Sequence, residues 1–238
     1  MSPRPAVRCR PSRWWSWAAG SGGGLGPVAV QLLWDAAAMD LNRQFAMPQG
    51  LGGRFVGRVM AVINRSQVRH VVGELAAVGD EHVLEIGFGP GVGLVALARS
   101  APRIRVAGVD PSAQMVVAAR RRTRSFGDRV SVREGTAAAL DWADGTLDAV
   151  LATNSVQLWQ PRVESLAEVL RVLRPGGRLV LGVLDRAVLP DGGSAGRQFD
   201  LSLLPDVRAA GFAGVEAAWR PSAGGGRELV VRAVRPSG

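Results

Sequence analysis

The chain has 238 residues, of which 47% are hydrophobic, so it is long enough to form one domain with a substantial core. Its formal net charge is +9. Because its arginines are interspersed with acids and few aromatic residues, this charge alone does not predict a nucleic-acid-binding surface. A single cysteine, Cys9, and two histidines, His70 and His82, exclude a disulfide framework and disfavour a zinc site. We therefore expect no metal centre and a cytoplasmic location.

Residues 1–38 differ in composition from the rest of the chain. They hold four of the seven tryptophans, four prolines and the Gly-Ser run 20–24. A basic start before apolar residues is typical of a secretion signal, but SGGGLGP interrupts the apolar part, and no apolar run reaches the length of a transmembrane helix. We expect a disordered N-terminal extension over 1–38 and a single domain over 39–238, with Met39 as an alternative start of the native protein.

From Met39 onward, the spacing of hydrophobic residues predicts alternating helices and strands. A loop-like stretch comes first. The predicted elements are loop 42–53, helix 54–77, strand 82–87, helix 91–100, strand 104–110, helix 112–125, strands 129–134 and 147–153, helix 161–173, strand 178–184, loop 185–197, helix 198–211, and strands 212–219 and 227–234. Apolar strands between helices indicate an α/β fold: a Rossmann-like, doubly wound, mainly parallel sheet of seven strands with helices on both faces. The last two strands have a short connection, so we expect them to be antiparallel.

Residues 83–93, VLEIGFGPGVG, lead a strand into glycines at alternate positions. These are Gly87, Gly89, Gly91 and Gly93. Glycine clusters of this kind mark places where the backbone approaches another group closely. The next strand ends at Asp110, and ligands of open α/β sheets bind at the carboxyl ends of strands. The turn and the acid together predict a nucleoside site in which Asp110 accepts hydrogen bonds from both ribose hydroxyls.

Two classes of nucleoside ligand fit this arrangement. A dinucleotide fingerprint, G-x-G-x-x-G, needs its third glycine at position 92 or 94, which hold Val92 and Leu94. The observed pattern is instead E-x-G-x-G-x-G, with Glu85 inside the strand. This pattern favours a nucleoside without a pyrophosphate. The structural alternative is a glycine turn that only packs a helix on a strand.

LEIGFGPGVG resembles the first motif of class I S-adenosylmethionine-dependent methyltransferases. Over about 82–184, VAGVDPSAQMV is similar to the second motif, REGTAAALDWADGTLDAV to the stretch that holds adenine, and LRVLRPGGRLVL to the turn before the fifth strand. Because four motifs occur in the right order, the resemblance is specific. It implies a methyltransferase that uses S-adenosyl-L-methionine as its cofactor.

The resemblance also implies roles for the matching residues. Glu85 would orient the methionine amino group, and Asp110 would bind the ribose hydroxyls. Gly87 and Gly89 would leave backbone room for the methionine part and the sulfonium, and Gly91 completes this cofactor-binding turn.

The adenine would lie beside Thr136 and Ala137. Many relatives have Gly-Asp-Ala where this chain has Gly135-Thr136-Ala137. The Asp would accept from the adenine amino group, whereas Thr136 offers only a short hydroxyl. Glu134 or Asp141 is the alternative acceptor.

The methyl acceptor of such folds binds segments before the first strand, after the fourth strand and in later insertions. The counterparts here are 42–55, 153–161 and 185–193, with candidate acceptor-site residues Phe45, Arg54, Asn154, Gln157 and Trp159. Asn154 would hold the acceptor or close over the sulfonium, or it is a turn residue. Trp159 is an apolar wall or part of the core, and Phe45 and Arg54 could form a lid. Transfer depends mainly on alignment, and neither His70 nor His82 is expected to act as a base.

The leading functional hypothesis is methylation of a small-molecule acceptor. The chain lacks, after the fourth strand, the Asn/Asp-Pro-Pro-Tyr/Phe sequence typical of base and glutamine methylation, so a nucleic-acid substrate is disfavoured. A second hypothesis is phospholipid head-group or nucleic-acid methylation, with the basic, Trp-rich residues 1–38 in peripheral contact with an anionic membrane. A third is a non-catalytic member that binds the nucleoside. The sequence leaves the oligomeric state open.

Overall fold

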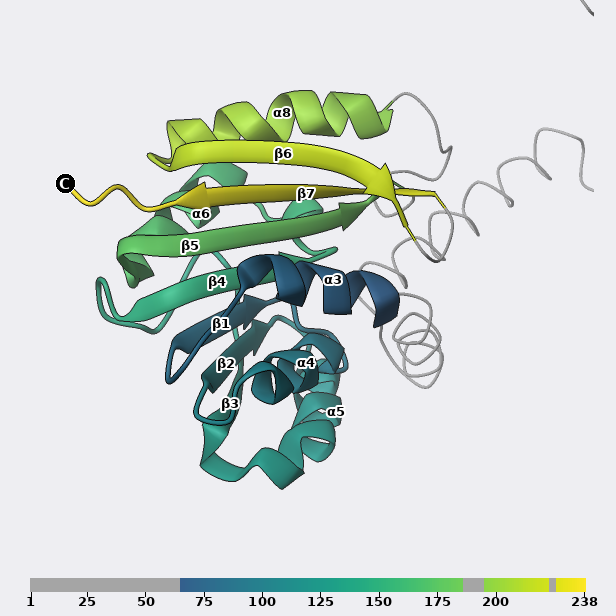
Figure 1. Ribbon diagram of the computed structural model, residues 1–238, viewed down its shortest axis with the longest axis vertical. Helices are drawn as coiled ribbons and strands as arrows, with labels where there is room; N and C mark the ends of the chain where they lie inside the picture. The colour runs from purple at the N-terminus through teal and green to yellow at the C-terminus, as the bar shows by residue number, and fades with distance from the viewer. Residues whose placement is uncertain (1–64, 186–194, 223–225) are drawn as a thin grey trace, which may run out of the picture. The chain divides into compact units, whose positions relative to one another are not determined.

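The computed structural model describes residues 65–185, 195–222 and 226–238, all within the unit Leu41–Gly238 (Figure 1). The predicted extension at 1–38 and the loop at 42–53 lie outside the described residues. In chain order the elements are α3 (Arg65–Leu75), β1 (His82–Ile86), α4 (Val92–Ser100), β2 (Arg105–Asp110), α5 (Ala113–Thr123), η1 (Arg124–Arg129), β3 (Val130–Glu134), β4 (Leu147–Thr153), η2 (Val156–Leu158), α6 (Arg162–Val172), β5 (Leu173–Leu184), α8 (Ala195–Ala209), β6 (Ala213–Pro221) and β7 (Arg227–Val234).

The strands form one seven-stranded sheet in the order β3-β2-β1-β4-β5-β7-β6. Neighbours from β3 to β5 are parallel, and β7 runs antiparallel to both β5 and β6. The predicted seven-stranded, mainly parallel α/β fold is therefore confirmed. From β1 the chain builds outward to β2 and β3 on one side and resumes at β4 on the other. The strand order thus reverses between β1 and β4, where open sheets bind their ligands.

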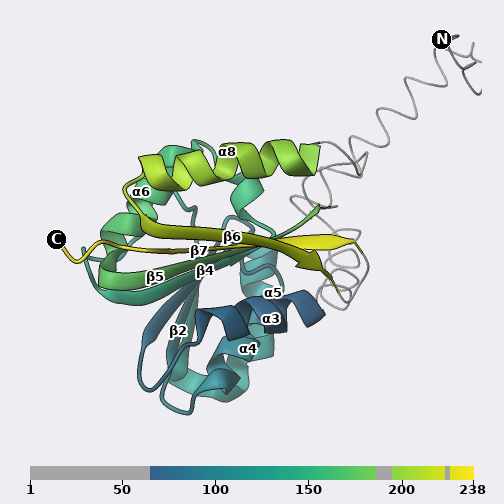
Figure 2. The same ribbon diagram turned by 45° about the horizontal axis from the view of Figure 1, so that its top comes forward.

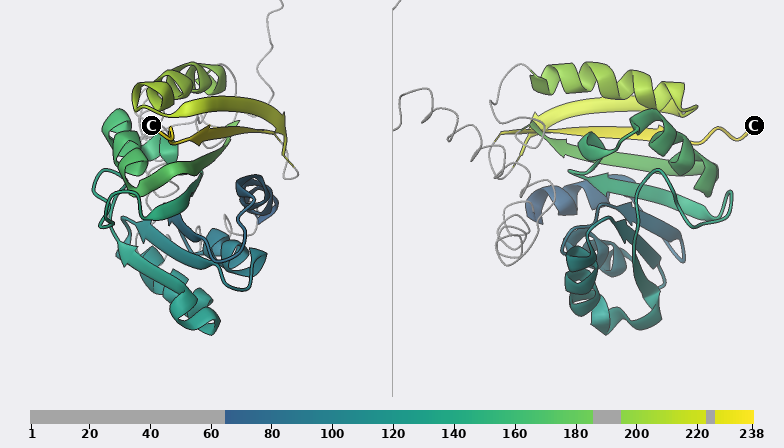
Figure 3. Two further views of the ribbon diagram at one scale, coloured as in Figure 1. Left: turned by 60° about the vertical axis from the view of Figure 1, so that its left-hand side comes forward. Right: turned by 180° about the vertical axis from the view of Figure 1, so that it is seen from behind.

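Helices cover both faces of the sheet, as predicted (Figures 2 and 3). Successive residues of β1 belong to opposite cores: Val83 packs in the cluster of α3, α4 and α5, and Leu84 in the cluster of α6 and α8. This alternation follows from the two-residue period of a strand. It also places Glu85, two residues after Val83, on the face that α3 and α4 cover.

Some boundaries differ from the sequence prediction. Helix α5 ends at Thr123 rather than 125, because the chain tightens into the 3₁₀ helix η1 and turns at Gly127, whose φ is 55°. Strand β5 begins at Leu173 rather than 178, because Leu173 already pairs with Leu147 of β4. These shifts leave the carboxyl ends of the central strands where the sequence placed them.

Arg171 of α6 holds the segment between β3 and β4 in place. Its guanidinium donates to the carbonyl oxygens of Leu140 at 3.0 Å and Trp142 at 2.9 Å. It also pairs with Asp144 at 2.5 Å and with Glu168 at 2.7 Å. This clamp fixes the stretch predicted to lie beside the adenine.

Candidate functional site

Asp110, at the end of β2, is tied to the glycine turn after β1. Gly89 N donates to its Oδ2 at 2.8 Å, and Ser112 N donates to its Oδ1 at 2.9 Å. The carboxyl is buried, and this burial raises its pKa, against the lowering effect of the two backbone hydrogen bonds. A carboxylate has about four acceptor positions, so Asp110 keeps capacity for two hydroxyl donors.

Glu85 lies on the neighbouring strand and is 2% exposed. Burial, and then repulsion from Asp110, raise the pKa of Glu85 to about 8, while a hydrogen bond from the Leu94 backbone lowers it. Within the described part of the chain its Oε2 has no hydrogen-bond partner. A buried carboxyl without a donor or a cation is costly, so this oxygen suits a positively charged or donating ligand group.

At two glycines of the turn, a neighbouring side chain leaves no room for a Cβ atom. A Cβ on Gly93 would lie 2.0 Å from Glu85 Oε1, so the Glu85 carboxyl fills the space beside the helix. A Cβ on Gly87 would lie 2.3 Å from the Cβ of Ser155, in the loop after β4. The cofactor role predicted for Gly87 therefore concerns its backbone and remains a prediction.

The other two glycines differ from each other. Gly91, with φ 79°, precedes α4, and its Cβ would lie 3.0 Å from that of Ala119 on α5. Gly89, with φ 52°, has nothing within 4 Å of an added Cβ. Gly89 is thus the position in the turn where open space meets bare backbone, as ligand approach requires.

The predicted adenine segment starts beside Asp110. Gly135 N donates to the Asp110 carbonyl oxygen at 3.1 Å, and Thr136 follows as an exposed residue bridged to Ala139. Ala137 is buried in the core. Thr136 therefore lies at the surface close to Asp110, while Ala137 contributes apolar packing.

The alternative adenine acceptor, Asp141, is engaged elsewhere. Its Oδ2 pairs with Arg133 at 2.6 Å, and Arg133 also lies over the Trp142 ring at 4.7 Å from the centroid. Glu134 is exposed at the end of β3. These contacts favour Thr136 over Asp141 as the residue facing the adenine.

Asn154 begins the loop after β4 with a positive φ of 53°. Its Oδ1 accepts from Leu184 N at 2.9 Å, and its Nδ2 donates to Gln67 Oε1 at 2.7 Å. These contacts favour the turn-residue alternative, because the side chain is committed to protein partners. The acceptor-binding role of Asn154 remains a prediction.

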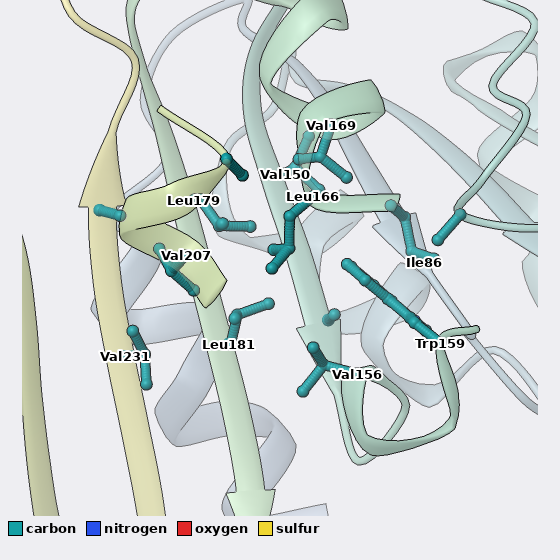
Figure 4. Packing of buried hydrophobic residues seen from close by; sticks show 14 of the residues in the cluster. Ile86, Val150, Val156, Trp159, Leu166, Val169, Leu179, Leu181, Val207 and Val231 are labelled. Atoms are coloured by element: carbon teal, nitrogen blue, oxygen red, sulfur yellow. The ribbon is translucent and has the colours of Figure 1, made fainter. Parts of the chain in front are cut away.

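Gln157 and Trp159 follow in the same loop. Gln157 Nε2 donates to the Asn154 carbonyl oxygen at 2.9 Å. Trp159 is 6% exposed and packs with Ile86 and Val156 (Figure 4), so the structure supports its core alternative. Phe45 and Arg54, with most of 185–193, lie outside the described residues.

Neither histidine lies at the glycine turn: His70 pairs with two acids, and His82 lies at the opposite end of β1. His70 contacts Glu74 at 2.7 Å and Glu228 at 2.8 Å, between α3 and β7. His82 begins β1, and burial lowers its pKa. Neither lies at the carboxyl ends of β1 and β2.

Sequence reasoning missed two polar residues at this site. Gln67 is 2% exposed on α3, and Ser155 is 7% exposed and donates its hydroxyl to the Ile86 carbonyl oxygen at 2.7 Å. Gln67 could have been found as a polar residue in the apolar stripe of its helix with Val71 and Leu75. Ser155 had no comparable signal.

Over the residues that the structure describes, no three His, Cys, Asp or Glu side chains gather as around a metal ion. No helix in the same residues is long and apolar enough to cross a membrane.

Comparison with known proteins places this site in context. Residues 83–177 match the family described as "Methyltransferase domain". The chain is 24% identical to the uncharacterized methyltransferase YdaC of Bacillus subtilis over 67% of this chain and 87% of that protein. It is 32% identical to the demethylmenaquinone methyltransferase of Deinococcus radiodurans over 53% of each chain, so it spans about half of that relative.

The fold has solved counterparts. The putative methyltransferase in complex with the Haloferax volcanii Trm112 methyltransferase activator superimposes with a TM-score of 0.63 at 19% identity, over 76% of this chain and 92% of that one. At this identity the likeness concerns the fold alone.

Proposed function

We propose that the chain is a class I S-adenosylmethionine-dependent methyltransferase that methylates a small-molecule acceptor. The observation that carries the proposal is the pair of buried carboxyls, Glu85 and Asp110, beside the glycine turn at the switch point. Neighbouring buried acids without a cation among the described side chains suit a positively charged nucleoside.

The residues present fit the cofactor S-adenosylmethionine. Glu85 Oε2 is a buried acceptor that would hold the amino group, and the spare acceptor positions of Asp110 would hold the ribose hydroxyls. Gly89 would admit the ligand against bare backbone, and Thr136 would contact the adenine. The roles of Glu85 and Asp110 use free hydrogen-bond acceptor positions, and the role of Gly89 uses open space.

When bound, the cofactor supplies a methyl group on a positively charged sulfur; transfer breaks the carbon–sulfur bond, forms the carbon–acceptor bond and releases one proton. The protein contributes alignment, because hydrogen bonds from Gly89 N and Ser112 N fix Asp110 against the glycine turn. The loop after β4 is fixed in the same way through Ser155, which bonds to the end of β1. Acceleration through alignment needs no covalent enzyme intermediate.

Two observations support a small, uncharged acceptor. The relative from Deinococcus radiodurans is named a demethylmenaquinone methyltransferase. The loop after β4 carries the neutral polar residues Thr153, Asn154 and Gln157, and no basic residue stands between Thr153 and Gln160. Phosphate-bearing acceptors are typically bound by arginine or lysine, so this loop favours a neutral acceptor over a phospholipid head group or a nucleic acid.

The test is a transfer assay with radiolabelled S-adenosylmethionine. We propose a cytoplasmic location, so a cytoplasmic extract and a set of quinone precursors are the first acceptors. We expect label in small molecules and tight binding of S-adenosylhomocysteine, with no binding of NADH by calorimetry. Label in phospholipid or nucleic acid would support those alternatives, and binding of S-adenosylhomocysteine without any transfer would indicate a non-catalytic protein.

A further inference from the structure

Three carboxamide residues are connected through the side chain and the backbone of Asn154, and we name them the carboxamide relay: Gln67 of α3, Asn154 after β4 and Gln157 of η2. Gln67 and Asn154 exchange two hydrogen bonds, from Asn154 Nδ2 to Gln67 Oε1 at 2.7 Å and from Gln67 Nε2 to Asn154 Oδ1 at 3.3 Å. Gln157 Nε2 then donates to the Asn154 carbonyl oxygen at 2.9 Å. The relay connects the helix before β1 to the loop after β4.

Two backbone groups fix the orientation of the whole relay. The Leu184 N–H can only donate, so the Asn154 atom facing it at 2.9 Å is Oδ1. Asn154 Nδ2 therefore faces Gln67 Oε1. The Asn154 carbonyl can only accept, so Gln157 faces it with Nε2. A flipped amide at either position would set two acceptors or two donors against each other.

The relay leaves one oxygen over. With Nε2 bound, Gln157 Oε1 is a buried atom that meets no hydrogen-bond donor in the described ranges. An unpaired buried carbonyl costs about 1–3 kcal/mol, and such atoms are rare in native proteins. A carboxamide oxygen is only an acceptor, so the group that completes it must carry an O–H or N–H.

This oxygen belongs to the loop that touches the cofactor turn. Ser155 packs its Cβ into the space above Gly87, and its hydroxyl bonds to the carbonyl oxygen of Ile86. Gln157 lies two residues later, so the relay and the glycine turn are parts of one fixed assembly at the switch point.

We propose that Gln157 determines acceptor specificity by accepting, through Oε1, a hydrogen bond from a hydroxyl or N–H group of the methyl acceptor, and that Gln67 and Asn154 are the positioning residues that aim it. The inference rests on the proposed function and narrows it, because it requires the molecule that receives the methyl group to carry a hydrogen-bond donor. Gln67 acts only through Asn154, which joins it to the loop.

The test uses two aromatic probes of similar shape with the full chain saturated with S-adenosylhomocysteine. 1-Naphthol donates a hydrogen bond, and 1-methoxynaphthalene does not. Calorimetry should show about tenfold tighter binding of 1-naphthol to the wild type, which corresponds to one hydrogen bond. Gln157→Met should reduce this preference to about twofold, and Gln67→Met should reduce it partly. Gln114→Met makes the same change at an exposed position of α5 and should leave the preference intact.

The ratio between the two probes separates specificity from a general structural effect, because a distorted loop weakens both probes together. Equal binding of the two probes to the wild type, absence of binding of either, or an undiminished preference in Gln157→Met overturns the inference. Binding of S-adenosylhomocysteine is measured first in every variant. If the wild type fails to bind it, the proposed function fails; if it binds and the probe preference is missing, only the acceptor inference fails.

Discussion

The two halves of the site, at the ends of β1 and β2 and at the ends of β4 and β5, differ in the charge of their polar side chains. At the ends of β1 and β2, two buried acids face bare backbone, and Glu85 retains an unpartnered oxygen. At the ends of β4 and β5, neutral amides satisfy one another and the backbone, and a single amide oxygen of Gln157 is left over. The acid end is therefore suited to a cationic ligand, and the amide end to a neutral donor. This difference in charge would let the proposed site distinguish a cationic cofactor from a neutral acceptor.

The largest expected effect comes from filling the space beside Glu85. In Gly93→Ala the new Cβ would lie 2.0 Å from Glu85 Oε1, so the carboxyl or the helix must move. We expect a loss of about 3 kcal/mol in the free energy of unfolding, as for an overpacked core, and no measurable binding of S-adenosylhomocysteine. Chemical denaturation and calorimetry measure the two effects.

Gly73→Ala is the matched control. Gly73 is in helix α3 with nothing within 4 Å of an added Cβ, so this change should stabilise the protein by about 0.5–1 kcal/mol. If the two variants had the same free energy of unfolding and the same affinity for S-adenosylhomocysteine, the close fit of Glu85 against α4 would be contradicted.

Asp110→Ala tests the second acid. The change removes the proposed ribose acceptor and the partner of Gly89 N and Ser112 N. We expect binding of S-adenosylhomocysteine to weaken by about 2–3 kcal/mol, or about 30- to 150-fold, on the scale of hydrogen bonds to a charged group. Calorimetry measures this change in affinity. Asp206→Ala is the control, because it removes an acid that pairs with Arg162 and lies outside the proposed site. Wild-type affinity in Asp110→Ala would remove the ribose assignment.

The pH dependence of binding should also distinguish the two ends. Because the pKa of Glu85 is raised to about 8, the free protein holds this carboxyl protonated at neutral pH. If the ligand's amino group binds the ionised form, binding releases a proton, and affinity rises about tenfold per pH unit from about pH 6 to about pH 7.5. Calorimetry at neutral pH in phosphate and in Tris should show nearly one proton released.

The raised pKa of Glu85 also affects the free energy of unfolding, which falls with pH where the affinity for the ligand rises. A raised pKa means that the folded protein binds more protons than the unfolded chain, so the contribution of Glu85 to stability is fully present below its ordinary pKa and is lost as pH rises toward about 8. Glu85→Gln should remove both the proton release and this part of the stability profile. Proton release that survives in Glu85→Gln would assign it to another group.

The sequence predicts which residues form the acid end, and at the amide end it points to Asn154 and Gln157 but not to the contact between Asn154 and Gln67. Glu85, the glycines and Asp110 stand next to strand ends that hydrophobic patterns locate, and local order along the chain is enough to bring them together. The relay joins Gln67 to Asn154 across 87 residues, and only the packing of α3 over β4 and β5 makes that contact. Trp159 shows the same limit, since its sequence fits either a wall or a core, and the fold of the loop after β4 buries it.

The smallest expected effect concerns the adenine. Thr136 is exposed and stands where many relatives of the family have Asp, and Asp141, the nearby alternative, is paired with Arg133. Thr136→Asp should supply a charged acceptor for the adenine amino group and tighten binding of S-adenosylhomocysteine by about 1 kcal/mol, or about fivefold, because solvent screens an exposed contact. Thr136→Val, which removes the hydroxyl at similar size, should weaken binding by a smaller factor. If Thr136→Asp weakened binding instead, the added charge would be opposing the acids at Glu85 and Asp110, and the adenine would have to lie away from residue 136.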